Sequence, residues 1–306
     1  MGGHIACGLA RSDVPVRVLS RSFAPSAART LPRHALIRGD AGNRLVLERA
    51  LAGIDEVLYC VGGLPPAAAE LDPDRDAALV LGPLRQLVAA LSGRPGVALT
   101  YLSSGGAVYG NPKRLPVSET DPPDPIGAYA AVRLAGERIV AGAHAEHGTP
   151  VRVLRCANVY GERQPVDRGQ GAVGVFLDRI SRGIPIELFG DGGVVRDYVY
   201  VGDVVDVIAR LLGRSDPFVV MNVGSGQGTS LNELISLIEA ATGRRAITVR
   251  RPGRGFDVDR VILDVARMRR LTSVEPVALA DGIARLVACA AEATASTESR
   301  QVAGMP

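Results

Sequence analysis

The sequence predicts a doubly wound α/β fold, in which helices cover both faces of a parallel sheet. Short runs of almost continuous apolar residues alternate along the chain with longer stretches at helical spacing. Strands buried on both faces have this pattern, and the right-handed crossover rule then places helices on both sides of the sheet. Apolar residues make up 47% of the chain and aromatic residues only 4%, so aliphatic side chains must fill the core.

The first half of the chain carries most of the predicted sheet. We expect strands over residues 14–19, 56–60, 97–103 and 151–155, and a shorter one over 35–38. The stretches between them predict helices over 44–52, 77–91 and 129–147.

After about residue 160 the alternation changes, which indicates a smaller C-terminal lobe. A polar loop over 163–171 precedes a helix over 173–182 and a strand over 186–189. A last sheet strand is expected over 219–223, between helices over 204–212 and 231–242. Asp203 is expected to cap the first of these two helices.

These elements divide the chain into two domains. Residues 1–160, with 195–225 contributing, form the sheet domain, and residues 161–289 mainly form the smaller lobe. Residues 290–306 are small and polar, and we expect a disordered tail there.

Composition and charge exclude several classes of protein. The 35 Lys and Arg against 32 Asp and Glu give a net charge of +3, which excludes a nucleic-acid binder that works by bulk charge. The four cysteines form no C-x-x-C pair, so neither a disulfide scaffold nor a metal site is expected, and a reducing cytoplasm is the predicted compartment. The chain shows no apolar stretch long enough to span a membrane and no signal peptide at Met1.

Tyr129 is the leading candidate for a catalytic group. It begins a predicted helix beside the carboxyl end of a strand, where open α/β sheets bind ligands. A phenol has a pKa of about 10, and a cation one helical turn later would favour the phenolate. Arg133 stands at that position, so Tyr129 is a plausible general acid/base. The alternative is a structural tyrosine with a surface arginine at helical spacing.

Five segments occur in a specific order along the chain. They are Ser103-Ser104-Gly105-Gly106-Ala107-Val108-Tyr109-Gly110, Tyr129-Ala130-Ala131-Val132-Arg133, Arg155-Cys156-Ala157-Asn158-Val159-Tyr160-Gly161, Phe189-Gly190-Asp191-Gly192 and Arg196-Asp197-Tyr198-Val199-Tyr200-Val201-Gly202-Asp203. Together they resemble the extended short-chain dehydrogenase/reductase family, in particular its NAD-dependent epimerase/dehydratase branch and the UDP-glucose 4-epimerase-like group. The resemblance covers roughly residues 1–285.

This resemblance implies a Rossmann-like, dinucleotide-binding sheet domain and a substrate lobe. It also implies a mechanism in which the tyrosine removes a proton from a sugar hydroxyl while NAD takes a hydride. A 4-keto sugar turns over in the pocket and takes the hydride back on its other face. The expected function is therefore that of a sugar-nucleotide epimerase or dehydratase, foremost a 4-epimerase of a UDP-sugar.

The chain departs from the family pattern at the catalytic residues. Arg133 replaces the lysine that holds the nicotinamide ribose, and arginine keeps the charge but is bulkier and planar. Gly105 stands where the family carries a catalytic hydroxyl. Ser104 is the nearest hydroxyl, one residue early, and neighbouring positions on a strand point to opposite faces.

The dinucleotide fingerprint is also incomplete. The chain opens at Met1-Gly2-Gly3-His4-Ile5-Ala6, which resembles only the last glycine of the Gly-rich turn and the helix that follows. We therefore expect the first strand and most of the Gly-rich turn to be missing. Either the functional protein extends further at its N-terminus, or the chain binds the cofactor poorly.

The resemblance assigns cofactor contacts to Gly2, Asp40, Gly62, Tyr129 and Arg133. At the end of the second strand of the fold, Ser20 and Arg21 replace the acidic residue that NAD-binding relatives carry. NADP is therefore possible beside NAD, although Arg21 could also be an exposed loop residue.

The resemblance assigns the diphosphate of the substrate to Asn158, Arg196 and Arg254, and it assigns Asp257 either to the ribose or to orienting Arg254. An arginine fork suits a diphosphate, and the alternative is a set of surface ion pairs. It further implies a homodimer formed through the helices over 77–91 and 129–147, with Ala89, Ala90, Ala130, Ala131 and Ala135 allowing close packing. Two other functions stay open: a catalytically impaired sugar-nucleotide-binding homologue and an NADP-linked reductase.

Overall fold

A computed structural model of the chain describes residues 1–12, 14–23, 31, 35–162, 164, 166, 171–214, 216–255 and 257–302. Four parallel strands form its main sheet, in the order β3-β4-β5-β9. Their bounds are Glu56–Tyr59, Ala98–Ser104, Val151–Cys156 and Phe218–Val223. Strands β1 (Val18–Ser20) and β2 (Leu36–Arg38) pair in parallel as a separate two-stranded sheet.

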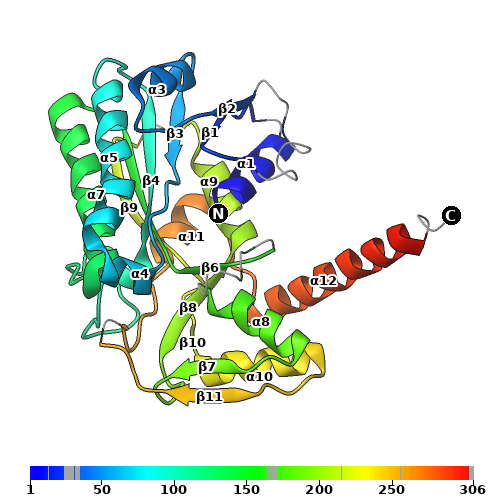
Figure 1. Cartoon of the computed structure of the whole chain (residues 1–306). Helices are drawn as coiled ribbons and strands as arrows, with labels where there is room; N and C mark the ends of the chain where they lie inside the picture. The colour runs from blue at the N-terminus through cyan, green and yellow to red at the C-terminus, as the bar shows by residue number, and fades with distance from the viewer. Residues whose placement is uncertain are drawn as a thin grey trace.

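Helices cover both faces of the main sheet, as the sequence predicts (Figure 1). On one face lie α3 (Arg44–Leu51), α5 (Pro73–Leu91) and α7 (Gly127–His147), and on the other α1 (Gly2–Arg11), α9 (Val201–Leu211) and α11 (Ala266–Thr272). Strand β5 shows why both faces are apolar. Val151 and Val153 belong to the cluster under α5 and α7, whereas Leu154 and Cys156 belong to the cluster under α1 and α9.

A second group of elements forms the smaller lobe. Its strands are β6 (Asn158–Tyr160), β8 (Val195–Tyr200) and β10 (Gly228–Ser230) in one sheet, and β7 (Ile186–Phe189) with β11 (Thr248–Arg251) in another. Its helices are α8 (Ala172–Arg182), α10 (Leu231–Thr242) and α12 (Leu279–Val302). Their apolar faces form a hydrophobic cluster of their own, around Phe176, Ile238 and Ile283.

Two short helices lie at the junction of these parts. Helix α4 (Pro66–Leu71) follows the β3 loop, and α6 (Gly105–Val108) follows β4 directly. Both come after the carboxyl ends of sheet strands, so they stand at the edge where α/β sheets bind ligands.

The structure differs from the sequence expectations at two helices, α12 and α9. Helix α12 continues to Val302 and projects from the body (Figure 1), where a disordered tail was expected from residue 290. Asp203 does not cap α9, because the helix starts at Val201 with Tyr200 as its N-cap. Asp203 instead accepts a hydrogen bond from the backbone N–H of Val277 at 2.9 Å.

Candidate active site

A cavity of about 840 Å³ opens at the carboxyl edge of the main sheet, between the sheet and the smaller lobe. It brings together nine of the residues that the sequence singles out. They are Gly2, Gly62, Ser104, Tyr129, Arg133, Asn158, Arg196, Arg254 and Asp257. These residues come from seven segments that are far apart in the sequence, so the cavity is a product of the fold.

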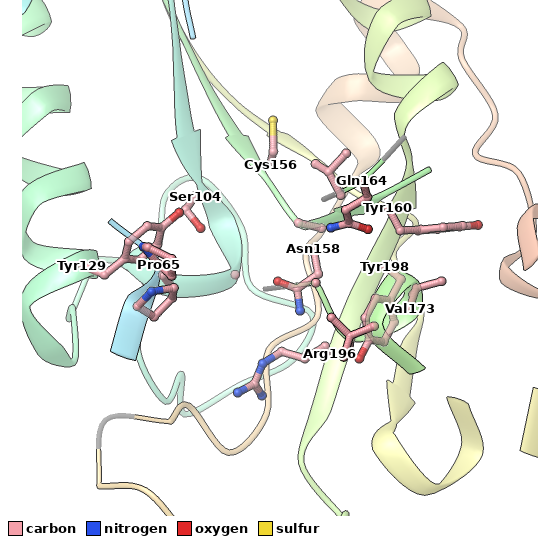
Figure 2. A pocket seen from close by; sticks show the side chains of 18 of the residues that line it. Pro65, Ser104, Tyr129, Cys156, Asn158, Tyr160, Gln164, Val173, Arg196 and Tyr198 are labelled. Atoms are coloured by element: carbon pink, nitrogen blue, oxygen red, sulfur yellow. The ribbon is translucent and has the colours of Figure 1, made fainter. Parts of the chain in front are cut away.

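Tyr129 and Ser104 stand at one end of this cavity. Figure 2 shows the two hydroxyl ends pointing toward one another, with Pro65 beside them. Ser104 is the last residue of β4, and its side chain lines the cavity although it lies one residue before the family position. A Cβ at Gly105 would lie 2.7 Å from the backbone oxygen of Arg155, which explains why this loop carries glycine there.

Arg133 is 6% exposed and lies under Tyr129, with its guanidinium carbon 4.8 Å from the centre of the phenol ring. Burial would lower the pKa of Arg133, but Tyr129, Tyr101 and Asp76 outweigh it and hold this pKa above its ordinary value. Arg133 is therefore a permanent cation. Its Nε has no hydrogen-bond partner among the described residues. A buried donor of this kind, in a residue that lines the cavity, is available to an acceptor on a ligand.

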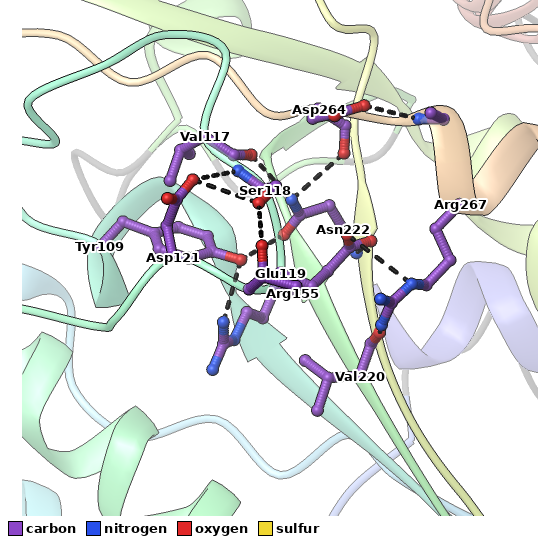
Figure 3. Close-up of polar contacts among 12 residues, drawn as sticks. Tyr109, Val117, Ser118, Glu119, Asp121, Arg155, Val220, Asn222, Asp264 and Arg267 are labelled. Atoms are coloured by element: carbon purple, nitrogen blue, oxygen red, sulfur yellow. Dashed lines mark hydrogen bonds and ion pairs between the residues drawn. The ribbon is translucent and has the colours of Figure 1, made fainter.

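A buried polar network fixes the strands and the helix that carry these groups. Glu137, two turns after Tyr129 on α7, forms an ion pair with Arg155 on β5 at 2.7 Å and accepts a hydrogen bond from Ser103 on β4 at 2.5 Å. Arg155 also donates to the Tyr109 hydroxyl at 2.9 Å. Figure 3 shows how Tyr109 in turn donates to Asn222 of β9, at 2.7 Å. The network holds α7, β4 and β5 in one fixed arrangement, since breaking a buried pair leaves an uncompensated charge.

Asn158 and Arg196 stand across the cavity from Tyr129, and both side chains point into it (Figure 2). The side-chain oxygen of Asn158 lies against Gly106, where a Cβ would approach it to 2.8 Å. Burial, with a contribution from Arg254, lowers the pKa of Arg196. An anion between the two guanidiniums would relieve this cost, so the pair suits a phosphate or diphosphate.

Arg254 and Asp257 form a two-pronged ion pair, with Nε to Oδ2 at 2.8 Å and Nη2 to Oδ1 at 3.0 Å. The Arg254 guanidinium also lies 4.3 Å from the ring centre of Phe189. Asp257 therefore orients the arginine at the cavity wall, and both groups remain partly exposed.

A further part of the cavity, at the N-terminus of α1, fits the diphosphate of a dinucleotide. Helix α1 begins at Gly2 with no acidic residue in its first turn and no side-chain cap, and its first residues line the cavity. The N-terminal turn of α1, with the positive end of the helix dipole, suits a phosphate there. A Cβ at Gly2 would lie 3.4 Å from the Cβ of Cys60, at ordinary van der Waals distance.

Three predicted cofactor residues do not line this cavity. Ser20 and Arg21 lie at the end of β1, where the Ser20 hydroxyl donates to the Ser22 carbonyl at 2.7 Å. Arg38, at the end of β2, donates to the backbone carbonyl of Arg21 at 3.3 Å. The Asp40 carboxylate accepts from the Gly42 N–H at 2.7 Å, within its own turn.

Sequence reasoning missed two acidic residues near the cavity. Asp76 is fully buried in α5 and accepts from the Leu64 N–H at 2.6 Å, which ties the β3 loop to this helix. Glu70 of α4 lines the cavity and accepts from the Ala128 N–H at 2.5 Å. Neither residue belongs to a motif, and only contacts between distant segments reveal them.

Two further kinds of site were sought in the described part of the chain. No group of three or more His, Cys, Asp or Glu side chains there could hold a metal ion. Across the same residues, no helix has both the length and the apolar character needed to cross a membrane.

Comparison with known proteins gave consistent results. The model of the NAD dependent epimerase/dehydratase family matches residues 1–224. A UDP-glucose 4-epimerase of Mycolicibacterium smegmatis is 39% identical over 219 residues, which are 71% of this chain and 69% of that protein. A dTDP-glucose 4,6-dehydratase of Streptomyces griseus is 33% identical over 277 residues, 86% of this chain and 79% of that protein. A third relative, from Methanocaldococcus jannaschii, is 35% identical over 189 residues, and the chain spans only 61% of its length.

Solved structures are similar over nearly the whole chain. The UDP-glucose 4-epimerase of Thermotoga maritima with UDP-glucose superposes with a TM-score of 0.88 at 30% identity, covering 96% of each chain. The Thermus thermophilus UDP-glucose 4-epimerase in complex with NAD gives a TM-score of 0.85 at 30% identity, covering 94% of each chain.

Proposed function

Because the chain belongs to the NAD-dependent epimerase/dehydratase family, we propose that it is a sugar-nucleotide epimerase, acting on C4 of a UDP-sugar. The observation that carries this proposal is the shared cavity. It places the Tyr129 phenol and its buried cation across from Asn158 and Arg196. An acid/base group and an anion site thus line the same cavity, as the sugar and the diphosphate of one bound sugar nucleotide require. Relatives that share the fold include proteins described as binding UDP-glucose and NAD.

NAD fits the other end of the cavity, where Gly2 at the α1 N-terminus would face its diphosphate and Gly62 would leave room beside it. The buried Nε of Arg133 would donate to the nicotinamide ribose. When bound, NAD supplies the hydride acceptor and donor that the reaction needs.

The chain's own residues bind and orient the sugar nucleotide and move the proton. Asn158, Arg196 and Arg254 hold the diphosphate, which leaves the hexose against Tyr129 and Ser104. The phenol oxygen of Tyr129 takes the proton of the C4 hydroxyl and returns it when the hydroxyl re-forms on the other face. Ser104 donates a hydrogen bond to the reacting oxygen. Arg133 stabilises the deprotonated phenol, and Glu137 keeps α7 in place through Arg155.

A Tyr129→Phe substitution tests this proposal. Removing the phenol oxygen should lower kcat for the interconversion of UDP-glucose and UDP-galactose by about 10²- to 10⁴-fold, the usual contribution of an acid/base group. Binding of UDP should stay unchanged by calorimetry. Tyr59→Phe is the matched control, since Tyr59 is a buried tyrosine whose hydroxyl donates to the Val80 carbonyl outside the cavity. Unchanged turnover in Tyr129→Phe would refute the acid/base role.

A second candidate is an NADP-linked reductase of the same superfamily, favoured by Arg38, whose guanidinium donates to the Arg21 carbonyl at the β1–β2 edge. A reductase consumes its nicotinamide cofactor, whereas an epimerase regenerates it within each turnover. Net loss of NADPH absorbance with a keto-sugar nucleotide would therefore favour the reductase.

We also propose a homodimer formed through α5 and α7, which lie side by side on the outer face of the sheet. Ala89 and Ala131 are exposed there and would let two copies of this helix pair approach closely. Light scattering that gives a monomer mass would exclude this arrangement.

A further inference from the structure

Helix α4 places a carboxylate at the Tyr129 end of the cavity. Glu70 lines the cavity together with Pro65, Pro66 and Ala67, which lead into and begin this short helix. Figure 2 shows Pro65 beside Tyr129 and away from Arg196. This wall therefore faces the hexose rather than the diphosphate of a bound sugar nucleotide.

The carboxylate of Glu70 is fixed by the helix that carries Tyr129. Helix α7 begins at Gly127 with no acidic residue in its first turn and no side-chain cap from Ile126. Glu70 supplies the missing cap from a different helix, by accepting the Ala128 N–H at 2.5 Å. The helix N-terminus stabilises a negative charge there. The Glu70 carboxylate is therefore held beside Ala128, the residue that precedes Tyr129.

Among the described residues, Glu70 forms no ion pair, and Gly106, Ala107 and Ile126 line the same cavity without a charged group. The cavity arginines are held by other contacts or lie at its far end. Arg133 is stacked under the Tyr129 ring, Arg196 and Arg254 stand at the diphosphate end, and Arg179 of α8 donates to the Pro185 carbonyl.

We propose that Glu70 determines sugar specificity: it favours sugar nucleotides with an uncharged hexose and rejects those whose hexose carries a carboxylate. This inference rests on the proposed function for the identity of the cavity. A hydroxymethyl or acetamido group can donate a hydrogen bond to the free carboxylate oxygen of Glu70. A uronate would place a second carboxylate near it, and such like-charge contacts are a strong source of discrimination.

The experiment is a comparison of UDP-glucose with UDP-glucuronate on the NAD-loaded protein, by calorimetric Kd. The wild type should bind UDP-glucose at least about tenfold more tightly. Glu70→Gln removes the charge but keeps an oxygen that can cap Ala128, and it should bring the two Kd values within about threefold. Glu162→Gln is the matched control, because it removes a cavity carboxylate that accepts from Tyr200, on the smaller lobe, and should keep the wild-type ratio.

Equal affinity of the wild type for both ligands, or an unchanged ratio in Glu70→Gln at an unchanged Tm, would overturn the inference. Binding of UDP without either sugar nucleotide would overturn it as well. The proposed function fails on a different observation. A protein with the expected Kd ratios that isomerises neither ligand would keep Glu70 as the specificity residue and lose the epimerase activity.

Discussion

At the Tyr129 end of the cavity the arginine is buried beneath the phenol ring, whereas at the other end the Arg254–Asp257 pair is partly exposed. Arg133 is 6% exposed beneath the phenol ring, while the side chain of Arg254 is 37% exposed. Packing sets the surroundings of a buried group, so small changes in size disturb it. The two residues that depart from the family pattern, Arg133 and Gly105, therefore lie at the buried end, whereas Arg196 and Arg254, the proposed diphosphate contacts, match the family pattern at the more open end.

The largest expected difference between the two ends concerns Arg133. Arg133→Met removes the buried cation while keeping an apolar stem, and should lower kcat by about 10²-fold with KM changed less than about threefold. Arg133→Lys keeps the charge and should retain kcat within about tenfold of the wild type. Steady-state kinetics checks both. A Met variant with normal kcat would mean that the cation is only structural.

At the diphosphate end, Arg196→Met should act on binding rather than on turnover. Losing hydrogen bonds to a charged group costs about 1.5–3 kcal/mol, which corresponds to a KM about 10- to 100-fold higher at nearly constant kcat. The exposed Arg210 of α9 provides a control for the loss of a positive charge. A fall in kcat equal to the rise in KM would place Arg196 at the reacting centre and remove the contrast.

A smaller effect is expected when the family hydroxyl is restored at Gly105. The new Cβ would meet the Arg155 backbone oxygen at 2.7 Å, and such overpacking costs about 1–3 kcal/mol. Gly105→Ser should therefore lower Tm by several degrees without raising kcat. Gly142→Ser on α7, where a Cβ meets nothing within 4 Å, should leave Tm nearly unchanged. A more active, equally stable Gly105→Ser variant would show that the packing around Gly105 can accommodate an added side chain.

The smallest effect is a difference in thiol reactivity. Burial raises the pKa of Cys60 to about 11 and of Cys156 to about 12, so both thiols at the sheet edge stay protonated at neutral pH. The thiolate is the reactive form, and Cys289 is exposed. Iodoacetamide should therefore label Cys289 in the native protein, and Cys60 and Cys156 only after unfolding. Mass spectrometry that finds Cys156 labelled first would show that the sheet edge around Cys156 opens in solution.

Elements with clear local signals could be predicted from the sequence. Helix α10 has its predicted bounds because Ser230 and Glu233 form a capping box and Gly243 ends the helix with a left-handed φ of 67°. Helix α5 begins four residues earlier than predicted, because Asp72 caps it through the Arg75 N–H. Strands β8, β10 and β11 were not predicted, since their pairing partners are distant in the sequence.

The same distinction applies to the site. Residues within ordered motifs, such as Tyr129, Asn158 and Arg196, line the cavity as the resemblance implied. Glu70 and Asp76 carry no such signal, because their roles come from the backbone N–H groups of Ala128 and Leu64 in other segments. Only the folded chain brings these donors to them.

The stacking of Arg133 on Tyr129 has a stereochemical consequence. Because the guanidinium carbon of Arg133 lies 4.8 Å from the centre of the Tyr129 ring, one face of this ring is closed to ligands. A hexose can reach the phenol oxygen only along the ring edge or from the uncovered side. The stacking therefore restricts the direction from which a ligand can approach the phenol oxygen, even before any ligand is bound.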